Sequence, residues 1–429
     1  METKKNYTLP IIMMILLFGM ISFVTNLAAP MGVVLKNKFG VSTAMGSLGN
    51  LMNFIAYAVM GIPGGLLLQR VGYKKTALIA VAIGFLGIFI QFLSGHSGES
   101  MAFYIYLLGA FVAGFSMTLL NTVVNPMLNT LGGGGNKGNQ LIQTGGAFNS
   151  IFATFTPAFV GILIGETTKA QISNVFPVLY IAMGIFALVG IVLWAVSIPE
   201  PHAQRFSEPL GNLMVGALKF RHFILGAVGI FAYVGVEVGT PAYANYWLSD
   251  IPEYGAIVGG SVAASYWFLM FIGRLFGASI GAKVSSKKML TFASVFAMIM
   301  LALAIFSPST TKVTLPLFQK SEETGALSFD FLQVPINAMF IVLVGLCTSI
   351  MWGSIYNLAV EGLGKYLAVA SGIFMTLVCG GGIIPYVQGL VADWAGYMPS
   401  YWVMFAGFAY LLFYALIGSK NVNKDISTT

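Results

Sequence analysis

The sequence predicts an all-α membrane protein whose twelve transmembrane helices form two parallel six-helix repeats. Three observations predict this class: the composition, the length of the apolar runs and the internal repeats. The chain has 429 residues, of which 57% are hydrophobic and 8% charged, with a mean hydropathy of +0.86. A soluble globular protein carries about 25% charged residues because its surface needs them. Most of the outer surface of this chain must therefore face lipid.

The apolar runs set the number of helices. They are continuous for about 20 residues, the length that a helix needs to cross about 30 Å of hydrocarbon, whereas a barrel would show alternating segments of about ten residues. The first run is too long for the apolar region of a cleaved signal peptide, so it counts as a span. The predicted spans are 9–35, 43–69, 75–94, 102–131, 139–165, 174–198, 222–248, 256–282, 288–307, 334–361, 366–392 and 399–419.

The basic residues predict the orientation. An even number of spans puts both termini on one side of the membrane, and Lys and Arg in short loops decide which side that is. Fifteen of the 21 Lys and Arg residues fall on the side of the termini, five fall on the other side, and Arg274 lies within a span. We therefore expect a multi-pass protein of the inner (cell) membrane with both termini in the cytoplasm. Because the basic residues are scattered, the net charge of +7 does not indicate binding to nucleic acid.

A proline-containing hydrophilic stretch, 199–221, divides the chain. It predicts an N-terminal six-helix half at 1–198, a cytoplasmic linker at 199–221 and a C-terminal half at 222–429. A second hydrophilic stretch, 308–333, is expected to be a long loop.

Three short strings recur in the same order in the two halves. The first recurs at an offset of 213 (283 − 70), the second at 211 (237 − 26) and the third at 228 (385 − 157). The insertion of 308–333 accounts for the larger last offset, so the strings predict duplicated halves of parallel orientation. The pairs are Arg70-Val-Gly-Tyr-Lys-Lys75 with Lys283-Val-Ser-Ser-Lys-Lys288, Asn26-Leu-Ala-Ala-Pro30 with Glu237-Val-Gly-Thr-Pro241, and Pro157-Ala-Phe-Val-Gly161 with Pro385-Tyr-Val-Gln-Gly389.

This two-half architecture resembles the major facilitator superfamily. The segment from Gly65 to Lys75 is similar to the signature of that superfamily between spans two and three, which has Gly, three residues, Asp-Arg, then Gly and two basic residues. The resemblance implies a gating role for Arg70. Gln69 replaces the usual Asp, which weakens the gating interaction that the acid makes with a helix end.

Further strings resemble the fucose/galactose/glucose:proton symporter family. They are Asn121-Thr-Val-Val-Asn125-Pro126 with Gly132 and Phe148-Asn149-Ser150, Tyr233-Val-Gly-Val-Glu237-Val-Gly239, Gly273-Arg274-Leu-Phe-Gly277, Asn357-Leu-Ala-Val-Glu361-Gly-Leu-Gly-Lys365-Tyr366 and Gly381-Gly-Ile-Ile-Pro385-Tyr-Val-Gln388-Gly389-Leu390. The resemblance implies a monomeric secondary active transporter that imports a monosaccharide, uses an ion gradient and needs no cofactor. The fucose-type members carry acids where this chain has Ala29 and Asn121, and Gly146 stands where they have a Gln. We expect the proton to be the driving cation, and sodium coupling stays open as the alternative.

Two groups of residues are candidates for the site. Amides and aromatic side chains suit sugar hydroxyls and ring faces, although each amide is equally explained by a hydrogen bond between helices. The predicted substrate-binding residues are Asn26, Asn53, Asn121, Asn125, Gln143, Asn149, Asn245, Trp352, Asn357 and Gln388.

Glu237 and Arg274 are the predicted ion-coupling residues. A carboxylate deep in a span costs about 2.5–3.5 kcal/mol on insertion scales, so it is usually paired, protonated or in contact with water. A purely structural ion pair between Glu237 and Arg274 is the alternative interpretation. Glu361, at the mouth of span ten, is predicted to act in gating, together with Arg70.

Other classes of protein fit less well. An efflux carrier for an amphipathic small molecule is the alternative of the same fold, but it would need a more apolar pocket with fewer amides. No nucleophile–base pair, P-loop or zinc pattern is present in the sequence, so we do not expect an enzyme. Cys347 and Cys379 lie in apolar runs and are expected to be small core residues.

Overall fold

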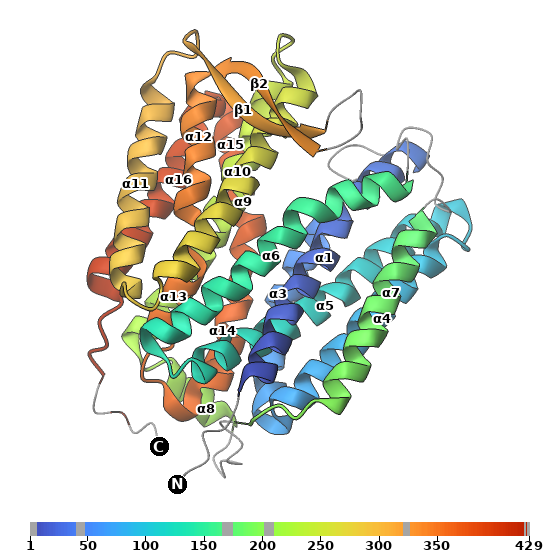
Figure 1. Cartoon of the computed structure of the whole chain (residues 1–429), viewed down its shortest axis with the longest axis vertical. Coiled ribbons are helices and arrows are strands. Elements are labelled where there is room, and N and C mark those ends of the chain that lie inside the picture. The colour runs from blue at the N-terminus through green and yellow to red at the C-terminus, as the bar shows by residue number, and fades with distance from the viewer. Residues whose placement is uncertain are drawn as a thin grey trace.

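The computed structural model describes residues 7–39, 48–164, 175–200, 210–320, 327–423 and 426. It consists of long helices that run roughly along one direction (Figure 1). The N-terminal half contains α1 (Thr8–Phe39), α3 (Leu48–Val71), α4 (Tyr73–Ser94), α5 (Glu99–Leu131), α6 (Gly135–Ile164) and α7 (Phe176–Ala195).

The C-terminal half follows a short helix, α8 (Leu210–Ala217), which lies in the predicted linker. It contains α9 (Arg221–Ser249), α10 (Gly255–Ile280), α11 (Ser286–Phe306), β1 (Lys312–Lys320), β2 (Leu327–Pro335), α12 (Ile336–Thr348), α13 (Met351–Ala359), η2 (Gly364–Tyr366), α14 (Leu367–Thr376), η3 (Leu377–Cys379), α15 (Gly380–Ala395), α16 (Tyr397–Phe413) and η4 (Tyr414–Gly418).

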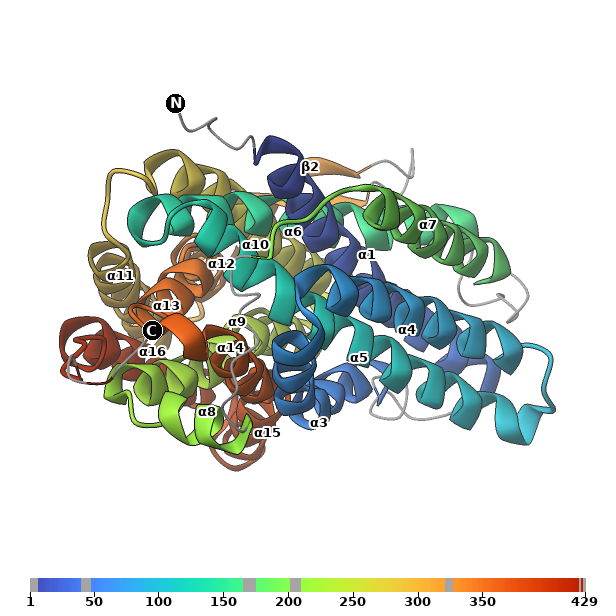
Figure 2. The ribbon, with the colours of Figure 1, turned by 90° about the horizontal axis from the view of Figure 1, so that it is seen from below.

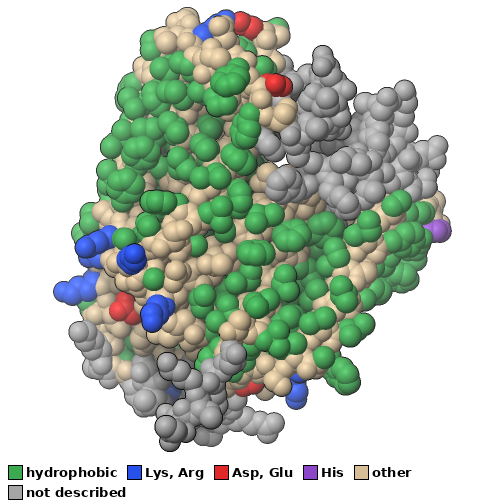
Figure 3. Space-filling view, viewed as in Figure 1, with side chains coloured by type: hydrophobic (Ala, Val, Ile, Leu, Met, Phe, Trp, Pro, Cys, Tyr) green, Lys and Arg blue, Asp and Glu red, His purple; other side chains and the backbone are tan. Residues whose placement is uncertain are grey.

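The predicted fold class is confirmed, because each predicted span coincides with one helix or with consecutive helical segments. Among the described residues, eleven helices or runs of consecutive helical segments are long and apolar enough to cross a membrane. Large apolar side chains such as Ile191, Phe292 and Phe306 are exposed. Hydrophobic side chains cover the middle of the face shown in Figure 3, whereas charged side chains gather toward the two ends, as expected for a surface in contact with lipid.

The stretch 308–333 is not the plain loop that we expected. β1 and β2 form an antiparallel hairpin that crosses α10 at the end of the molecule away from the termini (Figure 1). Val313, Leu315 and Leu317 alternate with more exposed residues and turn toward the helices. This alternation has the period of two that is typical of a strand, but charged and polar residues nearby gave the stretch a hydrophilic average.

The last spans of the chain are broken. Span ten divides into α12 and α13 at Ser349–Ile350, and span eleven divides at η3. A broken helix frees backbone carbonyls for other partners, which is tolerated at membrane depth only inside the protein or beside water. These breaks therefore mark places where backbone groups are available to side chains.

The two halves pack against each other most extensively through two helix pairs. Figure 2 shows α3 beside α14 and α6 beside α10. A Cβ added to Gly65 would lie 2.8 Å from Gly372 Cα, and one added to Gly61 would lie 2.5 Å from the Thr376 backbone nitrogen. We call the end of the molecule at which the chain termini lie in Figure 1 the termini face.

Glu200 of the linker supplies a carboxylate at the loop between α3 and α4, where the superfamily signature has an Asp and this chain has Gln69. The backbone N–H groups of Tyr73 and Lys74 donate to Glu200 Oε2 and Oε1 at 2.7 and 2.9 Å. Gly72 lies between α3 and α4 with φ of 86°, and a Cβ there would lie 2.6 Å from Glu200 Oε2. An acid at a helix N-terminus is favourable because it accepts from otherwise unpaired N–H groups. Glu200 therefore holds the end of α7 to the start of α4.

Candidate functional site

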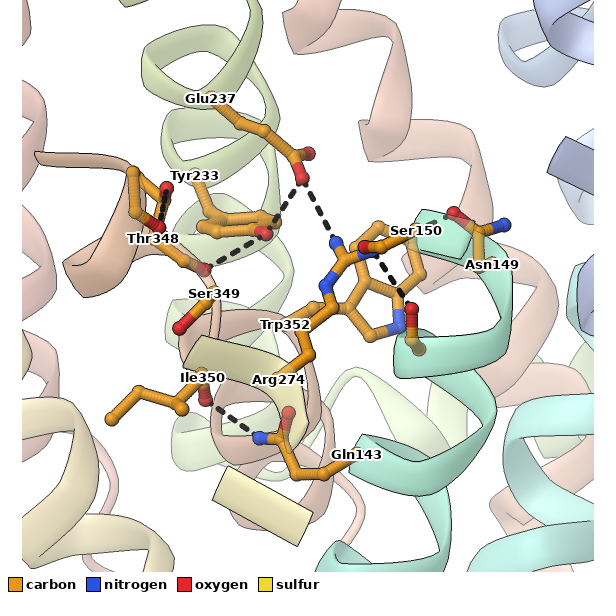
Figure 4. Close-up of polar contacts among 12 residues, drawn as sticks. Gln143, Asn149, Ser150, Tyr233, Glu237, Arg274, Thr348, Ser349, Ile350 and Trp352 are labelled. Atoms are coloured by element: carbon orange, nitrogen blue, oxygen red, sulfur yellow. Dashed lines mark hydrogen bonds and ion pairs between the residues drawn. The ribbon is translucent and has the colours of Figure 1, made fainter. Parts of the chain in front are cut away.

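An ion pair joins α9 and α10 (Figure 4). Glu237 is 16 residues after the start of α9 (237 − 221) and 12 before its end (249 − 237). Its Oε1 accepts from Arg274 Nη2 of α10 at 3.1 Å, and the two side chains are 12% and 10% exposed. The pairing that the sequence suggested is therefore present, and it brings together the two residues predicted to act in ion coupling.

Tyr233 connects this ion pair to the break in span ten. Its hydroxyl, one turn before Glu237 on α9, lies 2.9 Å from Glu237 Oε1 and 3.1 Å from the Thr348 carbonyl oxygen. Thr348 is the last residue of α12, and its Oγ1 lies 2.9 Å from the Tyr266 hydroxyl. The carboxylate thus accepts from the charged guanidinium, and it shares the single Tyr233 hydroxyl proton with the Thr348 carbonyl oxygen.

Arg274 also reaches into the other half of the molecule. Its Nη1 donates to Ser150 Oγ at 2.7 Å and to the Gly146 carbonyl oxygen at 3.1 Å, and lies 3.5 Å from Asn149 Oδ1. All three acceptors belong to α6. A Cβ on Gly146 would already contact Arg274 Cδ at 3.5 Å, so the missing side chain leaves room for the guanidinium. One cation therefore binds a carboxylate of its own half and acceptors of the opposite half.

Amide and aromatic side chains surround the ion pair. Gln143 Nε2 donates to the Ile350 carbonyl oxygen at 2.8 Å, and Asn149 Nδ2 donates to the Phe18 carbonyl oxygen at 3.1 Å. The Trp352 ring stands edge-on to that of Tyr233, with centroids 6.1 Å apart. Asn149, Trp352 and Glu237 keep partial exposure, so this group offers both polar atoms and an aromatic face.

A second polar group continues along α5. Trp352 Nε1 donates to Asn125 Oδ1 at 3.0 Å, and Asn125 Nδ2 donates to the Asn121 carbonyl oxygen at 2.8 Å. Asn121 Nδ2 donates to the Tyr57 hydroxyl of α3 at 2.6 Å. Asn53, also on α3, is buried against α5. Trp352 connects this group to the ion pair, because it bonds Asn125 and its ring packs against that of Tyr233.

Other predicted residues lie elsewhere. Gln388 is buried inside the C-terminal half, where Nε2 donates to Ser400 Oγ at 3.4 Å and Oε1 lies against Gly239. Asn245 is on the outer half of α9, away from the termini face. The side chain of Asn26 lies outside the described residues. The exposed side chains of Arg70 and Glu361 lie near the termini face, at the end of α3 and just after α13.

Sequence reasoning missed three participants. Ser150 and Thr348 are ordinary small polar residues of a span; Ser150 ends one of the strings that resemble the symporter family, but nothing in that string indicates a contact with Arg274. Asn129 continues the spacing of four that joins Asn121 and Asn125 on one face of the helix; this spacing was a usable signal. Asn129 Nδ2 donates to Asn357 Oδ1 at 2.7 Å, so Asn357 pairs across the two halves.

This arrangement suits a neutral polar ligand. It combines one carboxylate, one cation, several amides and aromatic rings, and it contains no further charged group among the atoms bonded to the ion pair in the described chain. The described residues contain no group of three or more His, Cys, Asp or Glu side chains that could hold a metal ion.

The fold and the site define a membrane carrier built from two helical halves with a polar centre between them. The chain belongs to the Major Facilitator Superfamily, whose sequence profile matches residues 11–386.

Curated relatives cover almost the whole chain. It is 31% identical to a glucose/galactose transporter of Brucella abortus (biovar 1, strain 9-941), over 98% of this chain and 96% of the relative. It is 22% identical to the L-fucose-proton symporter of Escherichia coli (strain K12), over 92% and 90% of the two chains. The crystal structure of FucP in the outward conformation superposes with a TM-score of 0.81 at 19% identity, covering 97% of this chain and all of FucP. These comparisons confirm the predicted family and fold.

Proposed function

We propose that this protein is a secondary active transporter that imports a monosaccharide by cation symport, with the proton as the driving ion. The observation that carries the proposal is the Glu237–Arg274 ion pair, which is buried at mid-membrane and also bonded to α6 of the opposite half. The named relatives, a glucose/galactose transporter and an L-fucose-proton symporter, support the same class of substrate.

The substrate site lies around the ion pair. Asn149, Trp352 and Gln143 supply hydrogen-bonding groups and an aromatic face, and Asn121 and Asn125 continue the polar wall on α5. A sugar hydroxyl binds in place of one of the weaker contacts, such as the 3.5 Å approach of Arg274 Nη1 to Asn149 Oδ1.

Glu237 is the coupling group. In the ionised form it holds Arg274, and Arg274 in turn holds Ser150 and the Gly146 carbonyl oxygen of the other half. Protonation removes the charge that attracts the guanidinium, so it weakens one side of this bridge and frees the carboxyl group to donate to a sugar hydroxyl. Binding of the proton and of the sugar are then linked through the same side chain.

The wider organisation follows from this role. The halves 1–198 and 222–429 move relative to each other about the linker 199–221, and the termini face is cytoplasmic. The protein acts as a monomer in the inner membrane, and an ion gradient replaces any cofactor.

The test is uptake of a panel of radiolabelled monosaccharides into proteoliposomes, with pH and sodium gradients imposed separately. We expect saturable accumulation of at least one hexose when the outside is acidic, and none when only sodium is imposed. Accumulation that follows sodium and ignores pH would contradict proton coupling but keep the sugar carrier. Absence of uptake for the whole panel, from protein that is folded and inserted, would favour an efflux carrier of amphipathic molecules.

A further inference from the structure

One hydrogen bond joins the two halves close to the termini face. Asn129, on α5, donates from Nδ2 to Asn357 Oδ1 on α13 at 2.7 Å. Asn357 Nδ2 donates in turn to Ser286 Oγ at 2.8 Å, at the start of α11. Both amides are only 8% exposed. Each lies two residues before the end of its helix, since α5 ends at Leu131 and α13 at Ala359.

These two residues occupy equivalent positions in the two repeats. Their separation of 228 (357 − 129) equals the offset of the helix ends (359 − 131) and of the repeated string at Pro157 and Pro385. Parallel repeats of this fold are related by a pseudo-twofold axis along the membrane normal. Equivalent residues of two related units meet only near the axis that relates them. The pair of Asn129 and Asn357 therefore lies at the centre of the route between the halves.

Uncharged contacts surround the pair. Gln143 Nε2 donates across the halves to the Ile350 carbonyl oxygen at 2.8 Å, and Asn139 Nδ2 lies 3.4 Å from Met289 Sδ of α11. A Cβ on Gly353 would lie 2.9 Å from Asn139 Oδ1, so α13 fits tightly against α6. Neutral amides hold the halves together here, and no ion pair joins them at these described contacts.

We propose that Asn129 and Asn357 are gating residues that keep the termini side of the pathway closed, and that α13 is the part of span ten that must move to open it. The proposal rests on the two-half carrier function. The break at Ser349–Ile350 lets α13 tilt away from α5 and α6 while α12 stays packed in the C-terminal half. Loss of the amide pair shifts the protein toward the state that is open on the termini side.

The first test measures this opening without any sugar. In a background with Cys347→Ala and Cys379→Ala, the added substitution Met289→Cys places a reporter thiol at a site that is 2% exposed and faces Asn139. Its rate of reaction with a polar maleimide is measured on the purified full-length protein in detergent. Asn129→Ala should raise the rate about two- to tenfold, which corresponds to a lost hydrogen bond between neutral groups.

Asn337→Ala is the matched control. Asn337 is also a buried amide, but it donates to the Ala304 and Ser307 carbonyl oxygens at 2.7 and 2.9 Å, within the C-terminal half. The control should leave the labelling rate unchanged even if it lowers the melting temperature. Equal rates for the parent and for Asn129→Ala, when both are monodisperse, would overturn the proposal. A rise of the same size in the control would also overturn it, because general loosening would then explain the effect.

The second test locks the gate. In the same cysteine-free background, Asn129→Cys and Asn357→Cys are combined and oxidised with copper phenanthroline. Two thiols then form one disulfide and give two electrons to the oxidant and two protons to the solvent. Cross-linking should abolish transport of a sugar that the reduced protein carries, keep binding of that sugar, and be reversed by dithiothreitol. Normal transport by fully cross-linked protein would contradict the assignment; if neither form transports sugar, the labelling test still decides it.

Discussion

The central ion pair allows a quantitative prediction about stability. Arg274→Met removes the cation but keeps most of the side-chain volume, and it leaves Glu237 with the Tyr233 hydroxyl as its hydrogen-bond donor among the described contacts. Removing one partner of a buried pair costs about 3–5 kcal/mol because the other charge stays buried and uncompensated. Both side chains are about nine-tenths buried, so the interaction is little screened by solvent.

Neutralising the partner should recover part of this loss. In the double variant Arg274→Met/Glu237→Gln no charge is left, although Ser150 Oγ and the Gly146 carbonyl oxygen still lose their donor. Residues in direct contact typically show coupling energies of about 0.5–3 kcal/mol. We therefore expect the double variant to be more stable than Arg274→Met alone.

The assay is the apparent melting temperature of each purified variant in one detergent. The single variant Glu237→Gln is included to complete the double-mutant cycle. Lys312→Met is the control, since Lys312 pairs with Glu253 on the surface, where the side chains are 40% and 58% exposed. Exposed pairs contribute about 0–1 kcal/mol, so this variant should melt like the parent. If Arg274→Met melts at the same temperature as the double variant, or above it, Glu237 is not an uncompensated charge without its arginine, and the electrostatic reasoning fails.

Three further predictions concern transport and topology. Glu237→Gln should exchange sugar across proteoliposomes but fail to accumulate it under an imposed pH gradient; normal accumulation would show that the driving ion binds elsewhere. Asn149→Ala should weaken sugar binding about two- to tenfold through a lost hydrogen bond, whereas Gln388→Ala should lower the melting temperature without changing affinity, as measured by equilibrium binding. Lys75→Cys and Lys312→Cys, both at exposed positions, should react with an impermeant maleimide from opposite sides of the membrane, and labelling of both from outside intact cells would contradict the topology.

The fold could be predicted because its main determinant is local. A span needs about 20 consecutive apolar residues wherever it packs, so α4 and α11 could be located within two residues at each end from hydropathy alone. The hairpin of β1 and β2 was not predicted because its alternation of apolar and polar residues is short and mixed with Lys and Asp. The break between α12 and α13 was not predicted because neither Gly nor Pro lies at Ser349–Ile350. Its cause is tertiary, since Tyr233 and Gln143 take up the carbonyl oxygens of Thr348 and Ile350.

The candidate site was harder to predict than the fold. A lone buried charge of each sign pointed to Glu237 and Arg274, since charges within spans are rare and are usually paired. Amides carry no such information: Asn149 beside the ion pair and Gln388 inside the C-terminal half look alike in the sequence. Their roles depend on which helix faces them, and this depends on the packing of segments that are distant along the chain.

The break in span ten connects the candidate site with the contacts between the two halves near the termini face. The Thr348 carbonyl oxygen accepts from Tyr233, which also contacts Glu237, and the Ile350 carbonyl oxygen, two residues later, accepts from Gln143 of the opposite half. We therefore expect a change in charge at Glu237 to act, through Tyr233, on the break at Ser349–Ile350 that positions α13. Because α13 carries Asn357 at its far end, a small tilt at the break becomes a larger displacement at the amide pair. Under the proposed coupling role of Glu237, its protonation can in this way reach the amide pair through hydrogen bonds alone, since no ion pair is among the described contacts along this route.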